Sequence, residues 1–383
     1  MRTRIAVVVF AVSLMSSPAR AQYCAPATSP AFPDDTFDTF FMQNGPGWTG
    51  GDSVFSVPLP NGDSFWRFSD SYIGTVNPLT RMRSSYLFNV HNAVATTDPA
   101  LTTFTTLYDN GGSATHPEPY FTTHNSNNWF WIGDGIVIQS SPGVYQIKQF
   151  LTKWTGLFQF LGESVVTLSY PSLAVVNYQT LNLTDKTLEW GARTLVIGPY
   201  LYIYGLEDLG ASGKYAHVAR TTVATIANYS AWQFWNIPQQ AWLTGPSNSS
   251  RILGDDPLTD PTGPSIANDY TVDPITTSAG ASYILVTEDT NPFYGDWSSI
   301  IVYYSCNPQG PWSAKQSVYT TPETGQQQKY GKLLTYNPRA HPEYTSNGEL
   351  LVHYNVNSTD SRDLVNANDY LPRFIRVPIA GLK

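Results

Sequence analysis

Two aspartates, Asp52 and Asp70, are the residues of this 383-residue chain whose type and spacing most clearly suggest chemistry. They stand near the two ends of residues 47–74, where runs rich in Val, Phe and Trp flank the turn sequence Pro-Asn-Gly at 60–62. If the proline starts a type I turn and the glycine takes the left-handed position, the loop has three residues and Asp52 lies opposite Asp70. If Asn-Gly alone forms a two-residue turn, the two acids lie on opposite faces.

In the opposed arrangement the Cβ atoms of the two aspartates would be roughly 4.5–5.5 Å apart, so that one acid has to be protonated or a group has to lie between them. Glycoside hydrolysis needs such a pair, because the leaving oxygen requires an acid and the anomeric carbon requires a base or nucleophile. We therefore predict that Asp52 and Asp70 are catalytic, with Asp70 as the favoured acid. The alternative is that both are strand-end acids bonded to backbone groups.

The elements that would position these acids are short β-strands. Only 13% of the residues are charged and 14% are aromatic, and the 28 Gly and 28 Pro residues form turn clusters throughout, which favours strands over helices. Strand-like runs fall into five groups, which begin near residues 47, 129, 188, 270 and 332. This pattern predicts an all-β fold, a five-bladed β-propeller of four-stranded antiparallel sheets over residues 47–383. Within it we expect single strands at residues 85–95 and 156–161.

Propellers bind ligands where their inner strands meet the central channel, so residues near the group starts are the predicted substrate contacts. These are Trp48, Asn92, Trp131, Asp134, Glu189, Arg193 and His341. All except Asn92 have a structural alternative: Asp134 could cap a buried turn, Glu189 and Arg193 could form an ion pair, His341 could be hydrogen-bonded between blades, and the tryptophans could be core residues.

The N-terminal residues 1–21 combine two arginines, an apolar run and an Ala-Arg-Ala site, which is typical of a secretory signal. Because no later stretch is apolar enough to span a bilayer, we expect a secreted, extracellular protein with no membrane partner. Residues 22–46 should form an N-terminal leader packed on the body. In an oxidising compartment Cys24 and Cys306 should form a disulfide. Glycosylation sequons begin at Asn182, Asn228, Asn248 and Asn357.

Composition also excludes several function classes. A net charge of −8 argues against a nucleic-acid partner, which would require a basic patch. High aromatic content with low charge suits a neutral polysaccharide or oligosaccharide, whose C–H faces stack on Trp and Tyr. We expect no metal and no cofactor, because clustered ligand spacing is missing, and no serine-nucleophile elbow, because no Gly-x-Ser-x-Gly occurs. We expect a monomer.

Several motifs together resemble a known group of enzymes. These motifs are Trp-Thr-Gly-Gly-Asp-Ser and Trp-Arg-Phe-Ser-Asp-Ser in the hairpin, Trp-Ile-Gly-Asp-Gly, Glu-Trp-Gly-Ala with Tyr-Ile-Tyr-Gly, and Tyr-Asn-Pro-Arg-Ala-His-Pro-Glu with Leu-Leu-Val-His-Tyr-Asn-Val-Asn. Over residues 45–380 the chain resembles secreted five-bladed β-propeller glycoside hydrolases, nearest the endo-D-arabinanase family once catalogued as a domain of unknown function.

The resemblance implies that the two carboxylates of the first-blade hairpin, Asp52 and Asp70 here, are the acid and the base. It also implies cleavage of a furanose-containing polysaccharide such as arabinan or D-arabinan. The second acid departs mildly from the family pattern, with Phe-Ser-Asp-Ser instead of Phe-Gly-Asp-Thr. The main alternative function is a carbohydrate-binding propeller without catalysis. An enzyme acting on sialic acids is disfavoured, since its ligand carboxylate would need clustered arginines and those of this chain are scattered.

Overall fold

The computed structural model describes residues 24–383 apart from 85–87, 157, 185, 256–259, 261 and 292–296. The predicted signal segment 1–21 therefore lies outside the described residues. The described chain is all-β, as expected, and its strands form antiparallel sheets of mostly four strands.

The sheets follow one another along the chain. The first comprises β3 (Phe55–Pro58), β4 (Ser64–Phe68), β7 (Ala93–Thr97) and β8 (Phe104–Leu107), and the second β9 (Asn128–Ser141), β10 (Val144–Thr155), β11 (Gln159–Ser169) and β12 (Val175–Thr180). The third contains β13 (Leu188–Ile197), β14 (Tyr200–Asp208), β15 (Lys214–Thr221), β16 (Gln233–Asn236) and β17 (Ala241–Thr244). The fourth contains β18 (Thr271–Thr277), β19 (Gly280–Glu288), β20 (Ser299–Ser305) and β21 (Gln316–Thr320). The fifth contains β22 (Leu333–Ser346), β23 (Glu349–Ser358), β24 (Pro372–Pro378) and β1 (Phe32–Pro33). A smaller sheet joins β2 (Gly47–Gly51), β5 (Ser71–Gly74) and β6 (Phe88–Val90).

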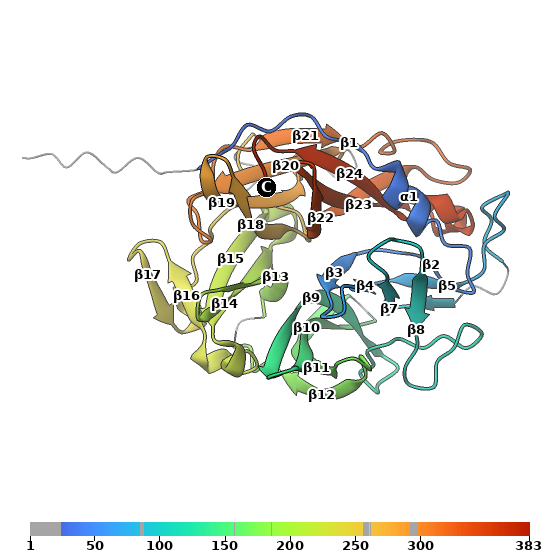
Figure 1. Ribbon diagram of the computed structural model, residues 1–383, viewed down its shortest axis with the longest axis horizontal. Helices are drawn as coiled ribbons and strands as arrows, with labels where there is room; N and C mark the ends of the chain where they lie inside the picture. Colours follow the sequence, from blue (N-terminus) through green and yellow to red (C-terminus); the bar gives the residue numbers. More distant parts are fainter. Residues whose placement is uncertain are drawn as a thin grey trace, which may run out of the picture.

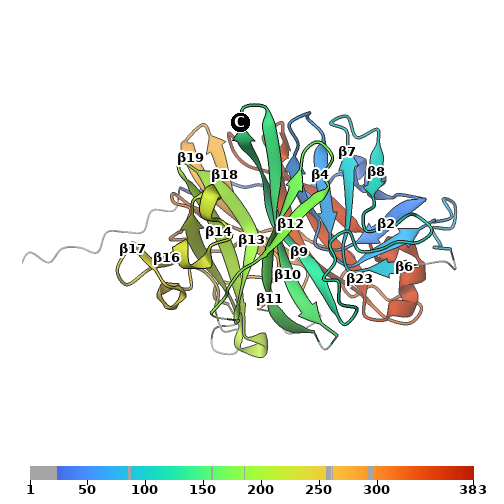
Figure 2. The ribbon, with the colours of Figure 1, turned by 90° about the horizontal axis from the view of Figure 1, so that it is seen from below.

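The larger sheets are arranged around a common centre, and they follow one another around it in sequence order, from blue to red (Figure 1). The first strand of each larger sheet lies innermost and contacts the first strand of the next: β3 with β9, β9 with β13, β13 with β18, β18 with β22, and β22 with β3 again. The strands run along the short dimension of the molecule, so their ends meet its two flat faces (Figure 2). Residues carried by the inner strands therefore converge at the centre.

The predicted N-terminal leader takes part in the body of the fold. Strand β1 pairs with β24, with Phe32 opposite Arg376, and so completes the last sheet. Helix α1 (Asp35–Phe41) follows, and the Asp34 side chain caps it by accepting hydrogen bonds from two backbone N–H groups. The apolar side of α1 packs into the core. The predicted disulfide between Cys24 and Cys306 is present, and it links this segment to the residue that follows β20 of the fourth sheet.

The hairpin register follows the three-residue turn. Phe55 pairs with Arg67 and Pro58 with Ser64, while Gly62 takes φ +92°. The same register carries through to β2 and β5, where Gly51 pairs with Ser71. Between the two ladders the Asp52 N–H donates to the Asp70 carbonyl at 3.1 Å, so the aspartates lie opposite each other. The two-residue alternative is excluded.

Two expected strands are corrected. The stretch 85–95, whose residues 85–87 lie outside the described chain, is divided between β6 and β7 in different sheets. The break falls at Asn92, whose amide donates to two carbonyls of neighbouring segments and so diverts the chain. The short strand expected at 156–161 is the start of the longer β11, because the left-handed Phe158 ends the turn before it.

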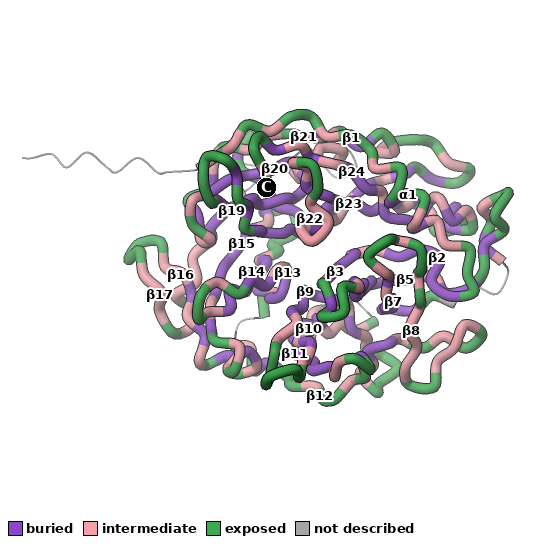
Figure 3. The backbone as a smooth tube through the Cα atoms, in the orientation of Figure 1, coloured by how far each residue is buried: buried purple, intermediate pink, exposed green. Residues whose placement is uncertain are grey.

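The apolar core lies between adjacent sheets, and exposed segments are mostly loops at the rim (Figure 3). Aromatic side chains account for much of this core, including Trp48, Trp66, Trp190 and Trp232, all essentially without solvent contact. Such burial stabilises a fold by about 25 cal/mol for each Å² of apolar surface. Within the described residues, none of the helices has the length and apolarity that crossing a membrane requires.

Candidate active site

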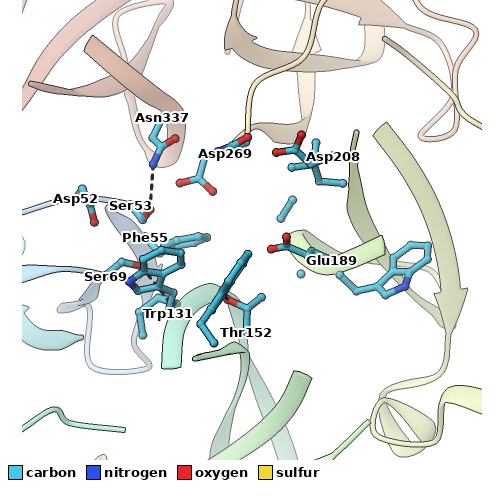
Figure 4. A pocket seen from close by; sticks show the side chains of 18 of the residues that line it. Asp52, Ser53, Phe55, Ser69, Trp131, Thr152, Glu189, Asp208, Asp269 and Asn337 are labelled. Atoms are coloured by element: carbon cyan, nitrogen blue, oxygen red, sulfur yellow. Dashed lines mark hydrogen bonds between the residues drawn. The ribbon is translucent and has the colours of Figure 1, made fainter. Parts of the chain in front are cut away.

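A cavity of about 270 Å³ opens where the inner strands meet. Its lining residues come from β3, β9, β10, β13, β14 and β22, from the turns that join β2 to β3 and β4 to β5, and from the loop before β18 (Figure 4). They are Asp52, Ser53, Phe55, Ser69, Trp131, Ile132, Gly133, Thr152, Trp154, Glu189, Trp190, Gly191, Ala192, Leu206, Asp208, Asn268, Asp269, Tyr336 and Asn337. Of the residues predicted from sequence, Asp52, Trp131 and Glu189 line this cavity.

Asp52 is held by a turn between β2 and β3. Ser53 adopts a left-handed conformation with φ +47°, which is costly for a residue with a Cβ and needs support from its surroundings. The buried Asn355 gives that support by accepting from the Ser53 N–H at 3.2 Å and donating to the Gly51 carbonyl at 3.1 Å. The Asn337 amide donates to the Ser53 hydroxyl. The turn therefore fixes the direction of the Asp52 side chain.

The surroundings of Asp52 favour its protonated form. The Tyr336 hydroxyl donates to Asp52 Oδ2 at 3.0 Å, while Oδ1 is buried and has no hydrogen-bond partner among the described residues. Burial, followed by the negative charge of Asp70, raises the pKa of Asp52 from 3.8 to about 8, and the nearby hydroxyls of Tyr336 and Tyr370 oppose this shift. At neutral pH this carboxyl can therefore donate a proton.

Asp70 has a different environment beside the cavity, and it is not one of the lining residues. Its Oδ1 accepts a hydrogen bond from Trp131 Nε1 at 2.9 Å, and His91 Nδ1 lies 2.8 Å from the same oxygen. The Tyr370 hydroxyl donates to the Asp70 backbone carbonyl at 3.2 Å. The Asp70 side chain remains 27% exposed. Two ring nitrogens thus lie at hydrogen-bond distance from one carboxyl oxygen and fix the orientation of the Asp70 side chain.

Three further carboxyl groups line the cavity: those of Glu189 and Asp208 lie across it from Asp52, and that of Asp269 lies between the two sides (Figure 4). Burial and then the charges of Asp208 and Asp269 raise the pKa of Glu189 to about 8. Burial also raises the pKa of Asp269, although Arg339 opposes this shift. Asp208 is paired with Lys214. The cavity therefore offers several carboxyl groups that can accept a hydrogen bond from a hydroxyl group or, when protonated, donate one to it.

The predicted contacts Asp134 and Arg193 belong instead to a buried ion network. Asp134 accepts from Arg67 and Arg193, each at 3.3 Å, and from the Thr194 N–H at 2.8 Å. Burial alone would raise the pKa of Asp134, but the arginines outweigh it and lower that pKa. Arg193 also pairs with Asp273. Asp134 therefore holds the inner strands together and is not exposed to the cavity.

The suggested ion pair between Glu189 and Arg193 does not form. The β13–β14 register shifts between Trp190 and Arg193, and Gly191 takes φ +94° in the resulting bulge. This bulge turns Glu189 towards the cavity. Arg193 lines a second cavity, on which Ser56 and Glu343 also lie.

The other predicted contacts are buried away from the cavity. His341 is hydrogen-bonded to the Ser56 hydroxyl at 2.6 Å and to His353 at 2.8 Å, the arrangement given above as its structural alternative. Asn92 bonds the carbonyls of Phe121 and Phe130. Trp48 is 1% exposed and stacks on core phenylalanines. These burials argue against direct substrate contact by all three.

Sequence reasoning missed the residues that shape the Asp52 environment, namely Tyr336, Asn337, Asn355 and Tyr370. Tyr336 and Asn337 open the Tyr-Asn-Pro-Arg motif, and a left-handed asparagine at 337 could have marked a bend. Asn355 stands in the Leu-Leu-Val-His-Tyr-Asn-Val-Asn motif, but neither it nor Tyr370 carries a local signal for this contact, because both reach the Asp52 turn and Asp70 only when the last sheet closes on the first. No group of three or more His, Cys, Asp or Glu side chains within the described residues could hold a metal ion.

These features define an all-β protein whose antiparallel sheets surround a cavity rich in carboxyl groups. The chain belongs to the family described as domain of unknown function DUF5005, whose model matches residues 34–379. No curated protein matches the chain.

Among solved structures, a candidate hydrolase from Bacteroides ovatus ATCC 8483 is 19% identical, with a TM-score of 0.70 over 96% of this chain and 97% of that one. This likeness shows a shared fold. Two structures are more distant. An endo-arabinase from Bacteroides thetaiotaomicron VPI-5482 is 13% identical, with a TM-score of 0.43 over 86% of this chain and 94% of its own. An α-L-arabinofuranosidase from Lactobacillus brevis is 8% identical, with a TM-score of 0.45 over 87% and 92%.

Proposed function

We propose that this protein is a secreted glycoside hydrolase that cleaves a furanose-containing polysaccharide, with arabinan or D-arabinan as the first candidates. One observation carries the proposal: the hairpin places Asp52 and Asp70 opposite each other beside a cavity, and their environments differ. A protonated carboxyl and a carboxylate on the same site are the two groups that glycoside hydrolysis requires.

In this proposal Asp52 is the acid and Asp70 the second carboxylate, the reverse of the preference taken from the sequence. The raised pKa of Asp52, about 8, supports its role as donor to the leaving glycosidic oxygen. The hydrogen bond from Trp131 to Asp70 supports the role of Asp70 as the base or nucleophile at the anomeric carbon. Removing Asp52 should leave the departing glycosidic oxygen without a proton donor. Removing Asp70 should leave the anomeric carbon without its base or nucleophile.

Glu189 and Trp131 are the proposed substrate contacts within the cavity. Glu189 faces Asp52 across the cavity and, with a pKa of about 8, can donate a hydrogen bond to a sugar hydroxyl at neutral pH. Trp131 presents an indole ring to the same space while its N–H orients Asp70. We assign supporting roles to Asp134, Arg193, His341, Asn92 and Trp48, since each is engaged within the protein.

We also infer that the larger sheets are the blades of a five-bladed propeller. The closed sequence of contacts between the five inner strands supports this architecture. The proposed processing and assembly are removal of residues 1–21, secretion and a monomeric mature chain. The disulfide is consistent with an extracellular protein.

The test is reducing-sugar release from arabinan, arabinogalactan and D-arabinan by the mature protein and by Asp52→Asn, Asp70→Asn and Glu189→Gln. We expect release from at least one glycan, a loss of at least about 1,000-fold in kcat in both aspartate variants, and a smaller loss, mainly in KM, in Glu189→Gln. Asp35→Asn, on the exposed side of α1, is the matched control and should retain full activity.

Equal release by the wild type and both aspartate variants would place the chemistry elsewhere. A loss in Glu189→Gln as large as in the aspartate variants would make Glu189 one of the catalytic acids. Binding of a glycan without release would favour the non-catalytic carbohydrate-binding propeller.

A further inference from the structure

A row of aromatic rings leads out of the cavity along the second sheet. Trp129 and Trp131 are two residues apart on β9, so their side chains share one face, while Phe130 between them is buried in the core. Trp154 on β10 is the direct ladder partner of Trp129 and therefore stands on the same face. Trp131 and Trp154 both line the cavity.

The rings contact one another in sequence. The centroid of Trp131 lies 5.0 Å from that of Trp154 and 5.9 Å from that of Trp129. Phe158, in the turn after β10, lies 5.7 Å from Trp129 and 6.0 Å from Trp131. His91 stacks on Trp129 at 4.5 Å. The row is therefore a continuous surface from the cavity wall to the turn.

The outer end of this row is open to solvent. Phe158 is 68% exposed and adopts a left-handed conformation with φ +54°. A large apolar ring that is exposed in a strained backbone conformation does not contribute to the core, and such features gather at binding sites. The same row reaches the proposed catalytic centre, since Trp131 donates a hydrogen bond to Asp70 Oδ1 and the Nδ1 atom of His91 lies 2.8 Å from that oxygen.

We propose that the row Trp131, Trp154, Trp129 and Phe158 is a platform on which successive sugar residues of the substrate stack. This inference rests on the proposed function and deepens it: the substrate is a chain that extends beyond the cavity. The cavity, at about 270 Å³, is smaller than the roughly 300–1,000 Å³ of sites that enclose a drug-sized ligand. A sugar chain bound there therefore has to extend out of the cavity. Flat aromatic faces suit neutral sugars, whose C–H groups pack on them without an ion pair.

The proposal predicts a chain-length effect. In Phe158→Ala, kcat/KM on the polysaccharide that the wild type cleaves should fall about tenfold through KM, because uniform binding is lost. On the shortest oligosaccharide that the wild type still cleaves, kcat/KM should stay within about twofold, since that ligand does not reach the outer rings. Phe32→Ala, which removes a 44% exposed phenylalanine on β1, is the matched control and should change neither value.

The measurement is the ratio of kcat/KM on polymer to kcat/KM on the short substrate for each variant, with melting temperature recorded. Phe158 is the decisive position, because removing an exposed ring should not impair folding. An active wild type with an unchanged ratio in Phe158→Ala would overturn the platform and leave the proposed hydrolase intact. A wild type that releases no sugar from arabinan, arabinogalactan or D-arabinan would overturn both.

Discussion

Replacing Asp52 by Asn should change how the stability of the protein depends on pH. Asn has the shape of a protonated aspartate and cannot ionise, so it keeps the neutral form that the site favours. In the wild type the folded state holds a proton up to a pKa of about 8, whereas the unfolded chain releases it near 3.8. The free energy of unfolding of the wild type should therefore fall as pH rises from about 4 to about 8. The variant should not show the share of this fall that comes from Asp52.

The magnitude follows from linkage. Each pH unit well between the two pKa values changes the free energy of unfolding by about 1.4 kcal/mol, and this slope falls to about half at the folded pKa of about 8. The change between pH 5 and pH 8 is therefore about 3.5 kcal/mol as an upper limit. The Asp52 side chain is only partly buried. We therefore reduce this value by about half for solvent screening and expect Asp52→Asn to gain about 2 kcal/mol on the wild type over that range.

The assay is urea denaturation of both proteins at pH 5, 6, 7 and 8, with Asp35→Asn as a control for loss of an exposed carboxylate. The difference between Asp52→Asn and the wild type should grow steadily with pH, while the difference for Asp35→Asn should stay nearly constant. Parallel curves for Asp52→Asn and the wild type would refute the reasoning, because they would mean that Asp52 is already ionised in the folded protein at neutral pH.

Three further changes test other parts of the structure. Arg67→Leu should cost about 3–5 kcal/mol in urea unfolding, because it leaves a buried carboxylate short of one partner. Arg362→Leu, in an exposed ion pair, should leave the urea midpoint almost unchanged, and equal shifts in the two variants would contradict this. Cys24→Ser removes the disulfide and should lower the free energy of unfolding by about 2–5 kcal/mol, and an unchanged urea midpoint would show that the link adds no stability. Trp131→Phe keeps a ring but removes the N–H bond to Asp70, so kcat should fall more than tenfold with little change in melting temperature, unless that bond has no role.

The hairpin geometry could be predicted because its determinants are local. The turn sequence at 60–62 fixes the loop length, and the loop length fixes the register that places Asp52 opposite Asp70. The grouping of strands could also be predicted, since runs rich in β-branched and aromatic residues are separated by clusters of turn residues. The edge strand β1 was not predicted, because two residues, Phe32 and Pro33, carry no periodic pattern.

The roles of polar residues could not be predicted from type alone. Glu189 and Arg193 share one strand and four-residue spacing, yet a two-residue bulge sends one to the cavity and the other to an ion network. Asn92 and His341 look like ligand contacts in sequence, but their partners are backbone and side-chain groups brought close only by folding. The Asp52 carboxyl is hydrogen-bonded by Tyr336, which lies 284 positions further along the chain, and the burial that raises its pKa exists only once the last sheet has closed on the first.

The pairing of β1 with β24 has a consequence for the order in which the protein can be completed. Residues 32–33 are among the first of the described chain to be synthesised, and their partners, Ile375 and Arg376, are among the last. Local hairpins can form as the chain emerges, but the final sheet lacks its fourth strand until both ends are available. Until then the outer edge of β24 presents unpaired backbone groups, the kind of edge on which chains associate wrongly. A circular permutant that joins the two ends and opens another turn would move this last step to a different sheet.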